Sequence, residues 1–114
     1  MIVLCSNGLS TDMLLSQLRG KMVNCERAAL VVTADNAYKE KNYHVPRCTA
    51  ELASLGLRVE LFDLDKQPAE LLSEYDVVEF IGGNPYYLLK SIRKHHADAV
   101  LKDIARTKIL IGWS

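Results

Sequence analysis

A pair of glycines follows an apolar run in the segment GGNPYY, at positions 82–87. Two glycines directly after a buried strand let the backbone turn tightly and come close to a ligand. Backbone N–H groups at the start of a helix form an anion site, which can hold a phosphate, a carboxylate or a developing oxyanion. A tight strand-to-helix turn that binds nothing would use the same residues. The residue types alone leave both interpretations open.

The second segment that could do chemistry is GWS at positions 112–114, which follows the apolar run KILI. Gly-x-Ser after a strand is the first half of a nucleophile elbow, in which a sharp turn exposes the serine hydroxyl at the top of a sheet. The second half, a glycine two residues after the serine, lies beyond the sequence. Gly-x-Ser also occurs by chance, so Ser114 is either a candidate nucleophile or an incidental serine.

Both segments need strands that end where these loops begin, and the sequence predicts five strands. Apolar runs lie near positions 1–5, 28–34, 57–63, 77–81 and 108–112. The run at 28–34, AALVVTA, is continuous and rich in β-branched residues, as in parallel strands that are buried on both faces. The run at 57–63 alternates more with polar residues, which favours a position nearer the edge of the sheet.

Segments with helical periodicity separate these runs. Ser10 or Thr11 predicts the cap of a first helix that ends at Gly20, with an apolar face made of Met13, Leu14, Leu15 and Leu18. Pro46 suits the first turn of a second helix, which Gly56 ends. A short helix is expected in AELLSEY, residues 69–75.

Two further helices follow the fourth strand. Asn84 predicts a helix cap and Pro85 the first helical residue, and another helix covers about 97–106. Alternating strands and helices predict a three-layer α/β/α fold with a mostly parallel, flavodoxin-like sheet, as a single domain over residues 1–114. Ligands of such sheets bind beyond the carboxyl ends of the strands, where both 82–87 and 112–114 lie.

Composition bounds the function. The 14 basic and 14 acidic residues give a formal net charge of zero, so charge gives no reason to expect nucleic acid or an anionic membrane as a partner. No apolar run approaches the roughly 20 residues of a membrane span, and the N-terminus does not look like a signal peptide, so we expect a cytoplasmic protein. Cys5, Cys25 and Cys48 fit no zinc or disulfide pattern, and we expect no cofactor or metal.

Together the two segments resemble a known family. EFIGGNPYYLLKSIRK followed by KILIGWS is similar to the peptidase E family of serine peptidases, which resembles class I glutamine amidotransferases in fold. The opening LCSNGLS is similar to that family's first strand and its serine/asparagine loop. The family includes dipeptidases that act on N-terminal aspartyl dipeptides, and it is related to cyanophycinases. The resemblance covers the whole chain but only about the first half of a family member.

The resemblance implies catalytic roles. Ser114 falls on the family's nucleophile, and Gly82 and Gly83 fall on the loop that supplies an oxyanion-hole N–H. The Ala-Gly that follows the nucleophile in the family lies beyond the sequence, so its oxyanion N–H does too. The implied substrate is a small peptide.

Other positions carry over as binding or supporting residues. Asn84 matches the third position of the family loop, where it both caps the helix and shapes the loop. Ser6 and Asn7 match the loop after the first strand and are candidate binding residues. Tyr86 and Tyr87 match an aromatic that packs under the site.

The resemblance also implies what this chain lacks. In the family the triad histidine and its acidic partner lie downstream of the nucleophile. His44 matches no catalytic position, and we expect His95 and His96 to cap a helix end or face solvent. A serine hydroxyl without a base is a poor nucleophile, so we expect this chain alone to be inactive.

Three hypotheses follow. The chain is a truncated peptidase E relative, or one half of a split hydrolase whose second chain supplies the histidine and the acid. Alternatively, it is a small flavodoxin-like binding module that uses the GGN loop for an anionic ligand. The resemblance favours peptidase E membership.

Self-association is the last expectation. In the family, downstream segments cover what the nucleophile strand and its neighbours expose. Without them, the last strand would offer an apolar patch or an unpaired edge, which soluble monomers avoid. We therefore expect a homo-oligomer that buries the region around Ile109, Leu110, Ile111 and Trp113, or a second chain that completes the domain.

Overall fold

The computed structural model describes residues 1–9 and 11–113 and contains a sheet of five parallel strands in the order β1-β5-β4-β2-β3. The predicted parallel sheet is confirmed. The strands are β1 (Ile2–Cys5), β2 (Arg27–Val31), β3 (Arg58–Phe62), β4 (Val77–Phe80) and β5 (Ile109–Trp113).

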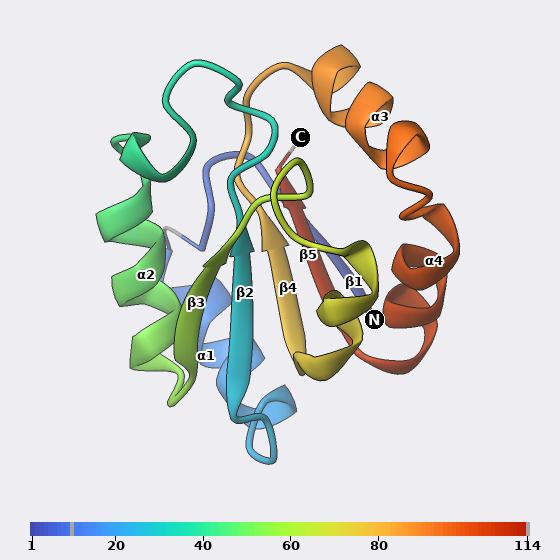
Figure 1. Ribbon diagram of the computed structural model, residues 1–114. Coiled ribbons are helices and arrows are strands. Elements are labelled where there is room, and N and C mark those ends of the chain that lie inside the picture. Colours follow the sequence, from blue (N-terminus) through green and yellow to red (C-terminus); the bar gives the residue numbers. More distant parts are fainter. Residues whose placement is uncertain (10, 114) are drawn as a thin grey trace.

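Helices cover both faces of this sheet, which confirms the three-layer arrangement. Figure 1 shows α1 and α2 on one face and α3 and α4 on the other. The α-helices are α1 (Asp12–Lys21), α2 (Val45–Ser54), α3 (Pro85–Lys94) and α4 (Asp98–Thr107). Two short 3₁₀ helices, η1 (Lys39–Lys41) and η2 (Ala69–Glu74), lie in the connections. No helix within the described residues is long and apolar enough to cross a membrane.

Local signals explain most helix ends. Thr11 caps α1, because its Oγ1 accepts a hydrogen bond from the Leu14 amide at 3.2 Å. Gly56, at a φ of +87°, follows the end of α2, as expected for a left-handed helix terminator. The prediction that α1 ends at Gly20 is wrong: the helix continues through this glycine to Lys21. One isolated glycine costs a helix only about 1 kcal/mol, which the other helical residues offset.

Alternate strand residues form two separate apolar cores. The core under α1 and α2 receives Leu30, Val77, Ile109 and Ile111 from the strands and Leu18, Cys48 and Leu52 from the helices. The core under α3 and α4 receives Ala29, Val31, Val78 and Phe80 from the strands and Ala97 and Ile104 from the second layer. Burial on both faces explains why the central strands read as continuous apolar runs. Met13 is an exception to the predicted helix face, because it is exposed.

The second strand is shorter than the predicted 28–34. Paired strand ends at Val31, although Val32, Thr33 and Ala34 remain buried. The Val32 amide still donates to the Phe62 carbonyl, whereas the Ala34 carbonyl accepts the Asn84 amide, at 2.9 Å, from the loop after β4. Beyond the strand, Val32 still belongs to the core under α1 and α2, Thr33 hydrogen-bonds Asp63 after β3, and Ala34 lies against the loop after β4.

The last strand is not an edge, so that part of the self-association prediction is wrong. β5 lies between β1 and β4, and Ile109 and Ile111 are buried under α1 and α2. The edges are β3, as its alternating pattern predicts, and β1. On β1, Ile2 is 60% exposed and Leu4 is 73% exposed. The apolar surface that the sheet leaves bare is therefore centred on β1.

Replacing Leu30 by alanine should lower the free energy of unfolding by about 2–5 kcal/mol, because it removes a fully buried side chain from a central strand. Leu61 is its register partner on β3 and is 39% exposed, so Leu61→Ala is the matched control. We expect the control to cost less than about 1 kcal/mol. Equal losses in urea unfolding would contradict the assignment of β2 to the centre and β3 to the edge.

Candidate functional site

The loops that carry the predicted site residues meet at the carboxyl end of the sheet, where β2 lies beside β4. The chain moves outward from β2 to β3 and returns through β4 to β5, so β2 and β4 flank a topological switch point. Gly83 closes this point. A Cβ on Gly83 would lie 2.6 Å from the Ala34 carbonyl oxygen, so only glycine lets the two backbones come this close.

Gly82 meets a side chain instead of a backbone. A Cβ there would lie 2.8 Å from Cε3 of Trp113, so the indole packs directly on the Gly82 backbone. The Asn84 amide is already bonded to the Ala34 carbonyl. Among the described residues, the amides of Gly82 and Gly83 have no hydrogen-bond acceptor. Two neighbouring N–H groups are thus left to donate at the start of α3.

Asn84 caps α3 as predicted. Its Oδ1 accepts from the amides of Tyr86 and Tyr87, at 3.0 and 3.2 Å, and Pro85 is the first residue of the helix. The expectation for the two tyrosines holds less well. Tyr86 is 83% exposed and packs under nothing, whereas Tyr87 points to Asp65 and donates its hydroxyl hydrogen to that carboxylate. Side chains one residue apart on a helix face different directions, so only one of them can turn inward.

Trp113 packs on the loop after β4 at Gly82, whereas the Ala34 backbone packs on it at Gly83. Its Nε1–H donates to Glu79 Oε2 at 2.9 Å. The His44 ring makes an edge contact with the indole, at 5.0 Å between centroids, and the Arg47 guanidinium lies 5.7 Å from the indole centroid. A Cβ on Gly8 would come within 3.2 Å of the indole. Residues from β4, from α2 and its N-cap, and from the loop after β1 therefore pack around this ring.

Arg47 also fixes the loop after β1. Its guanidinium donates to the Asn7 carbonyl at 2.9 Å and to Asn7 Oδ1 at 3.1 Å, and it pairs with Glu51 at 2.8 Å. Glu51 in turn accepts the Leu9 amide. The predicted binding residue Asn7 is thus engaged within the protein, and Ser6 is exposed. Sequence reasoning missed Arg47 and Glu51, whose i,i+4 spacing on one helix was the available signal.

His44 lies near the end of β5 but is not placed to act as a base. Its Nδ1 lies 3.2 Å from Arg47 Nη2. A guanidinium can only donate, so Nδ1 accepts this hydrogen bond and the neutral ring carries its proton on Nε2. The lone pair that a base needs is therefore taken by Arg47 in this arrangement.

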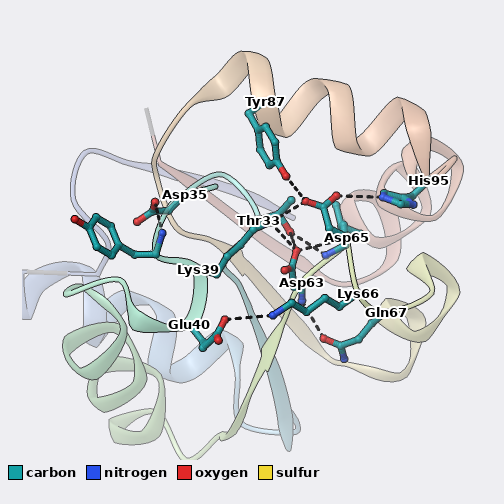
Figure 2. A network of polar contacts seen from close by, with 12 residues as sticks. Thr33, Asp35, Lys39, Glu40, Asp63, Asp65, Lys66, Gln67, Tyr87 and His95 are labelled. Atoms are coloured by element: carbon teal, nitrogen blue, oxygen red, sulfur yellow. Dashed lines mark hydrogen bonds and ion pairs between the residues drawn. The ribbon is translucent and has the colours of Figure 1, made fainter.

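A second polar cluster, the Asp65 network, lies at the ends of β2 and β3. Figure 2 shows Lys39 between Asp63 and Asp65, with Tyr87 and His95 of the α3 segment reaching the same Asp65 carboxylate. Lys39 Nζ lies 3.1 Å from Asp63 Oδ1 and 2.7 Å from Asp65 Oδ2. The network ties the loop after β2 and the loop after β3 to α3, the helix that begins directly after the glycine loop, residues 82–84.

Electrostatics explains the state of Asp65. Burial opposes its ionisation, but hydrogen bonds from Lys39, Tyr87 and Ser91 outweigh that effect and hold its pKa well below the usual range. His95 is the C-cap residue of α3 and the neighbouring His96 is exposed, as expected; in addition, His95 Nε2 lies 3.1 Å from Asp65 Oδ1. Asp65 follows β3 in the chain, so this contact joins the end of α3 to the loop after β3. His96 adopts a φ of +54° at the same helix end.

An apolar groove opens beside the glycine loop. It has a volume of about 450 Å³ and runs between β1 and β5 on one side and α3 and α4 on the other. We call it the β1–β5 groove; its walls include Ile2, Leu4, Leu110, Phe80, Leu88 and Leu101, and Gly82, Gly83 and Trp113 line it as well. A ligand on the free glycine amides would therefore border an apolar surface.

Ser114, the candidate nucleophile, lies outside the described residues. Within them, no group of three or more histidine, cysteine, aspartate or glutamate side chains could hold a metal ion. Burial raises the pKa of the Cys48 thiol to about 12, and it also raises that of Cys5, so neither thiol is activated as a nucleophile.

Gly83→Ala should lower the free energy of unfolding by about 1–3 kcal/mol or more, because the new methyl group would overlap the Ala34 carbonyl. Gly20→Ala is the control: nothing lies within 4 Å of the added carbon, and alanine favours the helix by about 0.5–1 kcal/mol. Urea midpoints should move in opposite directions for the two variants. A neutral Gly83→Ala would contradict the close approach of the two loops.

Asp65→Asn should flatten the loss of stability in acid. The folded-state pKa of Asp65 is depressed, so its contribution is present above the ordinary aspartate pKa near 3.9 and is lost as pH falls below it. From about pH 4 to pH 2, the free energy of unfolding should fall less steeply in this variant. Asp103→Asn, which removes an exposed pair with Arg106, is the control and should keep the wild-type slope.

Comparisons with known proteins bear on the family and the fold of this chain. The sequence model of Peptidase family S51 matches residues 2–114. An uncharacterised peptidase of Listeria monocytogenes, Lmo0363, is 32% identical over 104 residues, which are 87% of this chain and 48% of that protein. The chain therefore spans about half the length of this curated relative.

Two solved structures of peptidases also match almost all of this chain and little more than half of their own length. A crystal structure of a Listeria monocytogenes protein assigned to peptidase E matches 99% of this chain and 57% of its own, with a TM-score of 0.79 and 26% identity. A peptidase from an acI-B1 actinobacterium shares the fold, with a TM-score of 0.74 at 13% identity over 99% of this chain and 53% of its own. The family match covers nearly the whole chain: this chain belongs to peptidase family S51.

Proposed function

We propose that this chain forms the nucleophile-bearing half of a serine peptidase of the peptidase E type, with Ser114 as the nucleophile. The observation that carries the proposal is the pair of amides at Gly82 and Gly83. They have no acceptor among the described residues, and both glycines line the β1–β5 groove with Trp113, the residue before Ser114. Backbone N–H groups beside a serine are what acyl transfer requires to stabilise an oxyanion.

The geometry suits this role in two ways. The donors belong to a loop packed against the Ala34 backbone and the Trp113 indole, so they are held in place before a substrate arrives. They also precede the N-terminus of α3, whose dipole favours negative charge. When a serine attacks a peptide carbonyl, these amides would bind the oxygen that gains charge.

The base and its acidic partner are expected from the rest of the protein. Among the described histidines, His44 accepts from Arg47 and His95 is bound to Asp65. The L. monocytogenes relatives are about twice as long as this chain. We therefore propose that the 114-residue chain by itself does not hydrolyse peptides.

The proposed substrates are short peptides, with N-terminal aspartyl dipeptides as the first to test, and the proposed location is the cytoplasm. The substrate rests on the resemblance of the GGNPYY and GWS segments. The apolar walls of the groove would border the substrate, whereas the formal net charge of zero offers nothing to attract nucleic acid.

One alternative uses the same amides. An anion-binding module would hold a phosphate or carboxylate on Gly82 and Gly83, and Ser114 would have no role. The two functions differ in one observable: only the peptidase forms a covalent bond to Ser114.

A fusion tests the proposed activity. The chain joined at Ser114 to the part of the L. monocytogenes peptidase E that it does not cover should hydrolyse N-terminal aspartyl dipeptides and react with a fluorophosphonate at Ser114. The isolated chain should do neither, because loss of the triad base lowers the rate by several orders of magnitude. The fusion with Ser114→Ala is the control.

Two results would contradict the proposal. Stoichiometric labelling of the isolated chain at Ser114 would mean that the site is complete without a second half. A folded fusion with no labelling at all would instead support the anion-binding alternative.

We further propose that the isolated chain self-associates through β1 and the β1–β5 groove. Ile2 and Leu4 are exposed on an edge strand, the groove beside them is apolar, and no net charge keeps two copies apart. A second copy that pairs along β1 would cover both the strand edge and these side chains.

Leu4→Glu should convert the chain from a dimer to a monomer in sedimentation at tens of micromolar, because a charge at the centre of this surface opposes its burial. Val23, which is 79% exposed between α1 and β2, supplies the matched control, and Val23→Glu should leave the dimer intact. A wild-type chain that sediments as a monomer would contradict the proposal.

A further inference from the structure

Glu79 is a carboxyl group in the middle of a central strand. Its side chain is fully buried, and its register partners are Ile111 on β5 and Leu30 on β2. Placing an ionisable group among apolar residues costs stability unless its hydrogen bonds compensate. The site described above does not use this carboxyl directly, so its presence requires an explanation.

One oxygen of Glu79 has a single clear partner. Oε2 accepts the Nε1–H of Trp113 at 2.9 Å, whereas Oε1 has no hydrogen-bond partner among the described residues. The carboxyl thus satisfies the one polar group of the indole, which would otherwise sit over the core without an acceptor.

The six-membered ring of the indole packs against the glycine loop. A Cβ on Gly82 would lie only 2.8 Å from the Cε3 atom of the indole, and a Cβ on Gly8 would lie 3.2 Å from its Cζ2 atom. Trp113 also forms the carboxyl end of β5. A rotation of the ring would therefore move the Gly82 amide and the strand end together.

We propose that Glu79 is a positioning residue of the peptidase site: by holding the Nε1–H of Trp113, it fixes the indole against Gly82 and thereby sets the distance between the Gly82 amide and the end of β5. The inference rests on the proposed function, in which the glycine amides and Ser114 act on the same carbonyl. Glu79 acts through Trp113 and does not contact the substrate.

The charges around Glu79 make this hydrogen bond responsive to pH. Burial raises the pKa of Glu79 to about 7; the Trp113 hydrogen bond lowers it, Glu51 raises it, and Arg47 and the Cys48 thiol lower it. Glu51, Arg47 and Cys48 lie on α2, and Cys5 faces the same region from β1. Both thiols have raised pKa values and stay neutral here. Glu79 thus gains or loses its charge near neutral pH, and the bond weakens when it is neutral.

The test uses the indole N–H signal of the isolated chain in NMR spectra between about pH 5 and pH 9. Trp113 is the only tryptophan, so there is one such signal. In the wild type it should shift with a midpoint near pH 7. Glu79→Gln keeps an acceptor oxygen for Nε1–H but cannot ionise, so its signal should persist and no longer titrate.

His44→Gln is the matched control, because histidine is the other side-chain type that changes charge in this range and the His44 ring touches the indole. This variant should keep the titration. A shift that survives in Glu79→Gln, or one that disappears in His44→Gln, would overturn the assignment of Glu79.

Unfolding supplies an independent readout with a defined sign. Folded Glu79 keeps its proton up to about pH 7, whereas the unfolded side chain loses it near pH 4.5. The free energy of unfolding should therefore fall as pH rises through this window, and Glu79→Gln should lack that fall. Trp113→Phe removes the donor that lowers the pKa, so it should extend the fall to higher pH. Identical pH profiles in all three proteins would overturn the inference.

These readouts separate the inference from the proposed function. An inactive fusion with a Glu79-dependent indole titration would refute the peptidase proposal and keep Glu79 as the group that positions Trp113. An active fusion whose kcat is unchanged by Glu79→Gln from pH 6 to pH 8, with no indole titration in the isolated chain, would refute the inference alone.

Discussion

The indole of Trp113 is the contact on which the candidate site depends. It fills the space between the buried Glu79 carboxyl, the Gly82 backbone and the Arg47 guanidinium, at the point where β5 ends. Glycine is required at position 82 because a Cβ would overlap the ring. Gly82 and Trp113, about thirty residues apart in the sequence, therefore pack against each other, and each limits the size of the other side chain.

A second constraint acts from the other side of the glycine loop. Gly83 lies against the Ala34 backbone, and the Asp65 network holds α3 to the ends of β2 and β3. The glycine loop is therefore held on both sides by packing and by the hydrogen bond from the Asn84 amide to the Ala34 carbonyl. Among the described residues these two N–H groups have no acceptor, and both glycines line the β1–β5 groove, where the proposed oxyanion would accept from them.

The fold could be predicted because its strands are buried on both faces and its helices carry local end signals. Runs such as AALVVTA and caps such as Asn84 act over a few residues, so the sequence contains them directly. The order of the strands in the sheet is not determined by such local signals. The position of β5 between β1 and β4 depends on which apolar faces fit together, and so the exposed edge was expected on the wrong strand.

The candidate site was predicted as a motif and not as a set of contacts. The sequence indicates that glycines are needed after β4, but only the packing shows that one meets a carbonyl and the other an indole. Arg47, Glu79 and Asp65 were missed for the same reason. Each acts through partners distant in sequence, and their residue types fit an exposed charge as well as they fit a buried network.

The most direct test of the glycine amides as anion donors is an NMR titration of the ¹⁵N-glycine-labelled chain with methylphosphonate, a small tetrahedral anion. The chain has six glycines, so each amide can be followed separately. The signals of Gly82 and Gly83 should shift and saturate, whereas those of Gly20 and Gly56 should not move. Unchanged Gly82 and Gly83 signals, or equal shifts of all six, would contradict the account of this loop as a preformed oxyanion site.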